Sequence, residues 1–336
     1  MVTIMLLIIQ GLRDNTVGGD TYNYLVHYRM SNELSFGKMY DTYYFEVGYQ
    51  ILVSTLSKIG LPFQAFLFLV SAFNLTVFGL MTYQFSINPL VSYIFFYILG
   101  IYDFGFSGLR QSISMSLMLI AMYYVFKRKK GMYIFYVLLA GTFHTSALFF
   151  ILLIPFFEYK KVMRIYYKLY VPIVLALVLF GEKITEIVFS FYRSGVYTQS
   201  LNFLDSYFLG IGNDELLIVI ITFLGFIIYK SGDLPIKMHN YNVLYFILTL
   251  SLILQLLSPY NYFFSRFNLF LLQIVTLFIP VVLRYLFHKI SFSNLYVRYV
   301  VNTIAMFLLI IFAINFYDNY LDSNPHMILP HYFFWE

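Results

Sequence analysis

The sequence predicts an all-α integral membrane protein, and three features of its composition carry this prediction. Of its 336 residues, 61% are hydrophobic and only 11% are charged, and the mean hydropathy is +0.77. Soluble domains carry a charge on about a quarter of their residues, so this chain lacks the side chains that a water-exposed surface needs. Its 33 Tyr and 39 Phe residues suit helix ends at the membrane–water interface.

Apolar runs along the chain predict about 11 membrane segments in a single polytopic domain, residues 1–336. A helix needs about 20 residues to cross the hydrocarbon core, so several of these runs are short for a full span. The first run gives only about 18 Å of helix, so we expect a thinner bilayer there or a start further upstream. The runs lie at about 1–12, 63–85, 90–105, 108–126, 131–142, 145–158, 168–181, 213–229, 241–258, 267–287 and 297–316.

Cations in short loops predict the orientation, because Lys and Arg residues stay on the cytoplasmic side. The run Lys127–Lys130 is the strongest signal, and the cations between Lys160 and Lys168 are the next. Residues 131–158 are then too few for two full spans, and we predict a hairpin of two short helices that turns near 141–145. With this topology 13 of the 21 Lys and Arg residues, but two of the 16 acidic residues, face the cytoplasm.

The same parity places residues 13–60 and the helix start at Arg110 outside. Residues 46–59 are charged at both ends and carry one apolar helical stripe, which predicts an amphipathic helix lying in the membrane interface rather than a span. We predict an external loop at 182–212 and an external aromatic tail at 317–336 that anchors at the interface. The stripe consists of Val47, Ile51, Leu52, Thr55, Leu56 and Ile59.

Several classes of chemistry are not expected from this sequence. The absence of cysteine excludes disulfides and thiolate chemistry. No nucleotide-binding P-loop and no zinc-ligand spacing occurs, so we expect no cofactor and no metal. We attribute the net charge of +5 to loop cations that set the orientation in the membrane, and not to binding of nucleic acid. The first residues lack a basic region and a cleavage site, so no cleavable signal peptide is predicted.

The segment around Asp20 holds the first candidate functional residues. Asp20 follows two glycines and precedes a predicted helix, which fits an N-cap and equally fits a carboxylate placed for proton transfer. Arg13 lies earlier in the same segment, and it either pairs with Asp14 or Asp20 or binds an anion directly. Both interpretations of each residue remain open from the sequence.

Three further candidates come from distant parts of the chain. Arg110 follows Gly108 and opens a helix, where it either reaches to lipid headgroups or clamps an anion beside the free N–H groups of the helix start. His144 lies between two apolar halves and is either a structural histidine or one that donates to phosphate or takes a proton. Arg266 opens a predicted span on the outside, as an anchor or a third anion-binding arginine. Three arginines on one side suggest a polyanionic ligand such as a lipid-linked diphosphate sugar.

Six weak motifs, in order along nearly the whole chain, resemble the EpsG-type, Wzy-like polymerases of bacterial exopolysaccharide, capsule and O-antigen repeat units. They are Arg13 with Asp20 and Tyr24, Phe45 to Tyr49, Gly108 to Gln111, Phe143 to Ala147, Tyr262 with Arg266 and Phe267, and Ile328 to Tyr332 with Trp335.

The resemblance implies a metal-independent glycosyltransferase of the multi-span GT-C type, with interfacial helices in its first external loop. It would join undecaprenyl-diphosphate-linked repeat units outside the bacterial cytoplasmic membrane, supplied by a flippase and regulated by a chain-length regulator. The implied catalytic residues are Asp20 and His144. The implied substrate-binding residues are Arg13, Tyr24, Arg110, Gln111, Tyr262 and Arg266.

Two other functions remain as alternatives. A flippase for the same lipid would also need arginines, but transporters typically show repeated halves and broken helices near the midplane, and no repeat is visible here. A membrane O-acyltransferase would use a histidine, but its thioester donor comes from the cytoplasm, whereas His144 is predicted to face outside. A structural partner of a polysaccharide assembly system is a weaker third possibility.

Overall fold

The computed structural model describes residues 1–33, 37–38, 45–190, 213–231, 236–289, 303 and 326–335. Within these ranges the regular elements are helices, apart from one isolated β-bridge between Arg13 and Phe333. The all-α prediction is therefore confirmed for the described residues. The chain divides into two compact units, residues 1–151 with 299–336 and residues 152–298, and each is described by itself.

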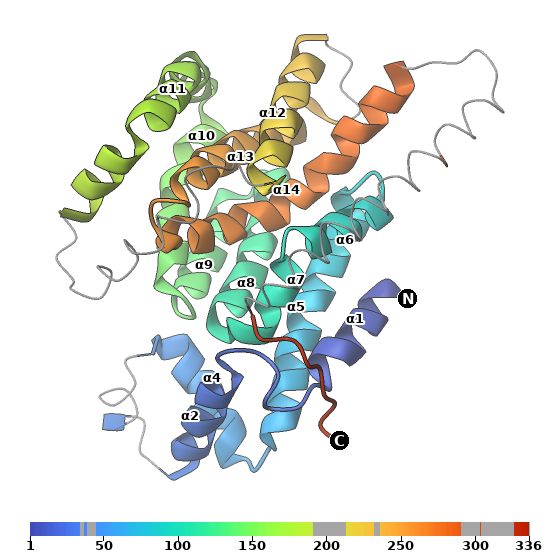
Figure 1. The fold of residues 1–336 in the computed structure, drawn as a ribbon, viewed down its shortest axis with the longest axis vertical. Helices are drawn as coiled ribbons and strands as arrows, with labels where there is room; N and C mark the ends of the chain where they lie inside the picture. The colour runs from blue at the N-terminus through green and yellow to red at the C-terminus, as the bar shows by residue number, and fades with distance from the viewer. Residues whose placement is uncertain are drawn as a thin grey trace. The chain divides into compact units, whose positions relative to one another are not determined.

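The first unit is a helical bundle built around α5, which packs against α1 and α8, while α8 also packs against α9 (Figure 1). Asn74 of α5 donates to the Ser112 hydroxyl at 2.9 Å and accepts from the Ser116 hydroxyl at 2.8 Å, so small polar residues let α5 and α8 approach closely. The helices of this unit are α1 (Val2–Gly11), α2 (Thr21–Glu33), α4 (Val47–Lys58), α5 (Phe63–Phe85), α6 (Pro89–Ile98), α7 (Ile101–Ser107), α8 (Leu109–Phe126), α9 (Lys130–Gly141) and the 3₁₀ helix η1 (Thr145–Leu153), which runs on into the second unit.

The second unit is centred on the pair α13 and α14, with α11 and α12 packed against α13. A buried polar chain joins the central pair: the Ser251 hydroxyl donates to Asn268, and the Asn268 amide donates to Gln255, both at 2.7 Å. Such hydrogen bonds fix the register of helices in an apolar medium. The helices are α10 (Ile154–Glu158), α11 (Lys160–Ser190), α12 (Asn213–Ser231), α13 (Met238–Leu257) and α14 (Tyr262–Lys289).

Five described helices are long and apolar enough to cross a membrane, and the pair α6 and α7, bent by 53°, makes a sixth if it counts as one span. The chain is therefore a multi-pass membrane protein. The predicted count of about 11 is not confirmed, because α1, α9 and residues 145–158 are apolar but too short to cross by themselves. The predicted span at 297–316 and most of the predicted loop at 182–212 lie outside the described residues.

The predicted hairpin at 131–158 is confirmed as two short helical segments joined by a tight turn. Helix α9 ends at Gly141, and η1 begins at Thr145. The buried Tyr133 hydroxyl donates to the Phe150 carbonyl oxygen at 2.5 Å, so the second segment returns beside the first. This hairpin brings the Thr142–Thr145 turn to the end of the bundle where α8 starts, since the Ser114 hydroxyl of α8 donates to the Ala140 carbonyl oxygen.

The predicted helix at 46–59 is present as α4, and at 12 residues it is too short for a span. Its protein-facing side is mostly polar and includes Tyr49, Gln50 and Ser54, while Val47 and Ile51 of the predicted stripe are exposed. The apolar stripe therefore points away from the protein, as an interfacial helix requires.

The C-terminal segment 326–335 is bound to the loop that follows α1 (Figure 1). Gly18 and Gly19 donate to the carbonyl oxygens of Met327 and His326 at 2.9 and 3.0 Å, and Asp14 donates to Tyr332 at 2.8 Å. The tail thus completes the structure of the first loop, and its anchoring in the membrane interface stays a prediction.

Candidate functional site

Arg110 lies in the first turn of α8, directly after a break between two helices. Helix α7 ends at Ser107, and Gly108 forms the N-cap of α8. A Cβ atom at Gly108 would lie 2.2 Å from the end of the Phe104 ring, so a larger residue at this junction would have to displace that ring. The first N–H groups of a helix have no partner within it, and they carry the positive end of the helix dipole. The backbone therefore creates an anion-favouring position at the residue where the arginine stands.

The Arg110 guanidinium is held by three neighbours, although 24% of its side chain remains exposed. It forms an ion pair with the Glu46 carboxylate. Its central carbon lies 4.2 Å from the centre of the Phe45 ring, a cation–π distance. The Tyr24 hydroxyl forms a hydrogen bond with the same group. The oxyanion that Arg110 binds in the structure is the Glu46 carboxylate.

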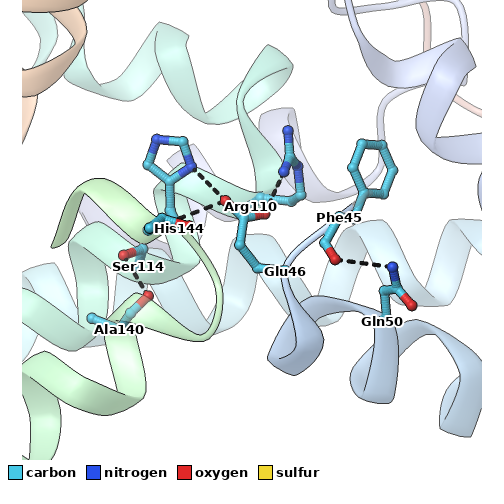
Figure 2. A network of polar contacts seen from close by, with 8 residues as sticks. Phe45, Glu46, Gln50, Arg110, Ser114, Ala140 and His144 are labelled. Carbon is cyan, nitrogen blue, oxygen red and sulfur yellow. Dashed lines mark hydrogen bonds and ion pairs between the residues drawn. The ribbon is translucent and has the colours of Figure 1, made fainter. Parts of the chain in front are cut away.

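Glu46 joins Arg110 to His144 (Figure 2). Its Oε2 atom contacts Arg110, while its Oε1 atom lies 3.3 Å from His144 Nδ1 and accepts from the Thr145 backbone N–H at 3.3 Å. Three separate segments meet in this cluster: the start of α4, the start of α8 and the turn after α9. We call Glu46, Arg110 and His144 the polar triad.

The Glu46 carboxyl is ionised over the whole physiological pH range. Burial by itself raises the pKa of this carboxyl, but the close contact with His144 Nδ1 and the charge of Arg110 lower it to about 2. Its side chain is 14% exposed, so the carboxylate is largely shielded from water. A shielded carboxylate interacts strongly with the two cationic or proton-accepting groups beside it.

A cluster of aromatic rings, formed by Tyr24, His27, Phe45 and Tyr49, lies beside Arg110. The His27 ring lies 4.7 Å from Phe45 and 5.7 Å from Tyr49, and Tyr24 lies 5.7 Å from Tyr49. Burial and then the Arg110 charge lower the pKa of His27 to about 4, so this histidine is neutral at pH 7. The cluster therefore adds no second positive charge behind Arg110.

The remaining candidates of the first external segment lie near the triad to different degrees. Asp20 directly precedes α2, in the predicted N-cap position, and its charge acts on Tyr24. Tyr24 therefore interacts with both residues, through the charge of Asp20 and through a hydrogen bond with Arg110. Gln111 is the residue after Arg110 and is buried in the bundle. The sequence-predicted group of Asp20, Tyr24, Arg110 and His144 thus gathers in one part of the first unit.

Arg13 has a different environment from the one predicted. Its side chain is fully buried, and its guanidinium donates to the carbonyl oxygens of Gln10 and Phe106. The Phe106 ring also lies 5.1 Å from the guanidinium carbon. These contacts tie the end of α1 to the end of α7. Of the alternatives predicted for Arg13, the pairing with Asp14 is not what the structure shows, because the Asp14 carboxylate accepts from Thr16 instead.

Arg266 and Tyr262 belong to the second unit, at the start of α14. Both side chains are exposed, and the Arg266 guanidinium carbon lies 4.8 Å from the centre of the Tyr262 ring. The predicted span at 267–287 lies within α14, which begins at Tyr262, so Arg266 stands one turn inside the helix rather than at its first residue. The joining of this pair with Arg110 around one ligand stays a prediction.

Glu46 is the functional candidate that sequence reasoning did not single out. It lies inside the motif from Phe45 to Tyr49, but the apolar stripe of that segment predicted only an interfacial helix. The available signal was an acidic residue directly before a helix whose second residue is glycine. Among the residues that the structure describes, no group of three or more His, Asp or Glu residues could hold a metal ion, and metal independence stays a prediction.

Comparison with known proteins identifies one relationship. The family model described as the EpsG family matches residues 1–330, nearly the whole chain. No curated protein and no solved structure matches it.

Proposed function

Since the chain belongs to the EpsG family, we propose that it joins undecaprenyl-diphosphate-linked oligosaccharide repeat units on the outer face of the bacterial cytoplasmic membrane. Family membership implies a polymerase-like role in polysaccharide biosynthesis, and the candidate spans make the chain a multi-pass membrane protein. The specific proposal is a metal-independent glycosyltransferase of the GT-C type that needs no cofactor.

The observation that carries the proposal is the polar triad. Arg110 stands at a helix start, where the backbone favours an anion, and it already holds a carboxylate oxygen. An arginine guanidinium also matches the geometry of phosphate oxygens. We assign Arg110 to the diphosphate of the donor, where it offsets the negative charge that develops as the diphosphate leaves. Arg266 and Tyr262 stay predicted substrate-binding residues, while the buried Arg13 does not touch the substrate in this proposal.

The reaction also needs a group that accepts a proton. The acceptor hydroxyl attacks the anomeric carbon of the donor sugar, the bond to the diphosphate breaks, and the hydroxyl proton leaves. Asp20 and His144 are the two candidates for that proton, and Tyr24 and Gln111 are the proposed substrate-binding residues beside Arg110. General bases of this kind contribute about 10²–10⁴-fold to the rate.

The partners in this proposal are those that the family resemblance implies. The substrate lipid enters from the membrane, a flippase supplies it on the outer leaflet, and a chain-length regulator limits the product. Nothing in the proposal involves nucleic acid.

The proposal is tested in cells that lack their own polymerase for the same repeat unit. Arg110→Ala and Asp20→Asn are compared with Arg164→Ala, an exposed arginine of α11 outside the triad. We expect long polymer with the wild type and the control, and single repeat units on the lipid with Arg110→Ala. Membrane amounts are measured by immunoblot. Full-length polymer from both Arg110→Ala and Asp20→Asn, at normal protein amounts, would contradict the proposal.

A further inference from the structure

The Glu46 carboxylate is fixed in place by a close contact between two backbone segments. The Gly48 N–H donates to the Thr142 carbonyl oxygen at 2.8 Å, and a Cβ atom at residue 48 would lie 2.3 Å from the Thr142 hydroxyl oxygen. The Gln50 amide closes the start of the helix by donating to the Phe45 carbonyl oxygen at 2.9 Å. Glycine at position 48 therefore lets the start of α4 reach the turn that carries His144.

This contact places the carboxylate between two groups of opposite function. One oxygen faces the Arg110 guanidinium, and the other faces Nδ1 of the His144 ring and the Thr145 N–H (Figure 2). The 3.3 Å between Oε1 and Nδ1 is longer than an ideal hydrogen bond. Catalytic pairs often show such distances without substrate and tighten when it binds.

A carboxylate beside one ring nitrogen determines what the other nitrogen can do. In neutral imidazole one nitrogen carries hydrogen and the other has a free lone pair. With a negative oxygen facing Nδ1, the hydrogen is favoured on Nδ1, and Nε2 is left as the proton acceptor. The same carboxylate stabilises the imidazolium ion that forms when Nε2 takes a proton.

We propose that Glu46 is a positioning residue that holds His144 with Nε2 as the base for the acceptor hydroxyl. This inference rests on the proposed function, and it selects His144 over Asp20 as the proton acceptor. The hydroxyl oxygen forms a bond to the anomeric carbon as the carbon–oxygen bond to the diphosphate breaks. The electron pair of that bond leaves with the diphosphate, whose charge Arg110 offsets, and the hydroxyl proton moves to Nε2. His144 then returns the proton to water or to the released diphosphate.

The charged groups that face His144 in the described part of the chain support this assignment. Glu46 approaches from the start of α4, and Arg110 of α8 lies on the opposite side of that carboxylate. The ion pair with Arg110 keeps Glu46 ionised, so the carboxylate stays available to the imidazolium. When the donor diphosphate contacts Arg110, the carboxylate has only His144 left as its cationic partner.

The test uses the full-length protein in liposomes with a lipid-diphosphate-linked repeat unit, and the rate is followed from pH 4 to pH 9. For wild type we expect a loss of rate at low pH as His144 is protonated. Glu46→Gln lowers the rate at neutral pH by at least about tenfold and moves this acid limb to lower pH, because the imidazolium loses its counter-charge. His144→Asn removes the limb. An acid limb that stays in place in Glu46→Gln would overturn the proposal, because a residue that only holds the fold does not shift it.

A double variant separates positioning from an independent role. If Glu46 acts through His144, Glu46→Gln with His144→Asn is no slower than His144→Asn alone. Losses that multiply would show that the two residues act separately, and the inference would be wrong.

A second measurement does not depend on polymerisation. Nitrogen NMR of ¹⁵N-histidine-labelled protein in detergent reports the tautomer of His144, whose signals are assigned by their loss in His144→Asn. We expect hydrogen on Nδ1 in wild type and a mixture of tautomers in Glu46→Gln, because the amide offers a donor as well as an acceptor. The same tautomer in both proteins would overturn the inference. Wild-type protein that polymerises nothing would instead contradict the proposed function.

Discussion

Arg13 and Arg110 stand on the two sides of one helix junction, and their environments are opposite. Arg13 donates to the Phe106 carbonyl oxygen near the end of α7, whereas Arg110 lies in the first turn of α8, just after Gly108. A helix end exposes carbonyl oxygens and a negative dipole, while a helix start exposes N–H groups and a positive one. Arg13, at the helix end, therefore donates to backbone carbonyl oxygens. Arg110, at the helix start, is paired with the Glu46 carboxylate.

The difference teaches that an arginine beside a membrane helix is not by itself a ligand site. The pKa of Arg13 is lowered to about 9 by burial, which leaves its guanidinium charged at pH 7, yet backbone carbonyl oxygens already accept its hydrogen bonds. Arg110 keeps part of its side chain exposed, and its partner is a carboxylate rather than backbone oxygens. Exposure and the type of partner separate a structural arginine from a candidate ligand-binding one.

The largest expected effect is on the folded state, from Arg13→Ala. This change removes the Arg13 donor from the buried Gln10 carbonyl oxygen, at a cost of about 1–3 kcal/mol, while the Phe106 carbonyl oxygen still accepts from the Thr21 hydroxyl. We expect a strong fall in the amount of monodisperse protein in detergent and a lower midpoint of thermal unfolding. Size-exclusion chromatography and a thermal melt measure both, with Arg164→Ala as the control. We expect Arg110→Ala to remain folded. If Arg13→Ala melts at the same temperature as the wild type, the distinction between a structural Arg13 and a ligand-binding Arg110 is wrong.

A smaller effect, on activity, is expected from Gly48→Ala. The added methyl group pushes the start of α4 from the Thr142 turn and separates Glu46 from His144, which lowers polymerisation by about tenfold. Gly131→Ala is the matched control, because a Cβ atom there meets nothing within 4 Å. The measurement is polymer length at equal protein amounts. Wild-type polymer from Gly48→Ala would show that this close contact does not position the triad.

The smallest effect is the pH dependence of stability that Glu46 contributes. A carboxyl whose pKa falls from 4.5 in the unfolded chain to about 2 in the fold stabilises the fold above pH 4.5. That contribution is lost as the pH falls from 4.5 towards 2. We expect Glu46→Gln to flatten the fall of the melting midpoint across this window. Parallel curves for the two proteins would mean that the ion pair does not stabilise the fold.

The helical class and most helix positions could be predicted from hydropathy, because each depends on neighbouring residues. The run at 63–85 coincides with α5, and the hairpin at 131–158 turns where the glycine and polar residues predict. The number of spans could not be counted in the same way. A short apolar run such as α1 or α9 satisfies its local pattern, whether or not it crosses the bilayer by itself.

The sequence by itself determined that this protein is a helical membrane protein of the EpsG family and that Arg110 and His144 are candidate functional residues. Only the tertiary structure showed that Arg13 donates to buried backbone oxygens and that Glu46 contacts both Arg110 and His144. Hydropathy and helix signals act over a few residues along the chain. The triad instead depends on a glycine contact between α4 and a turn almost a hundred residues later, and such a contact exists only after the bundle has packed.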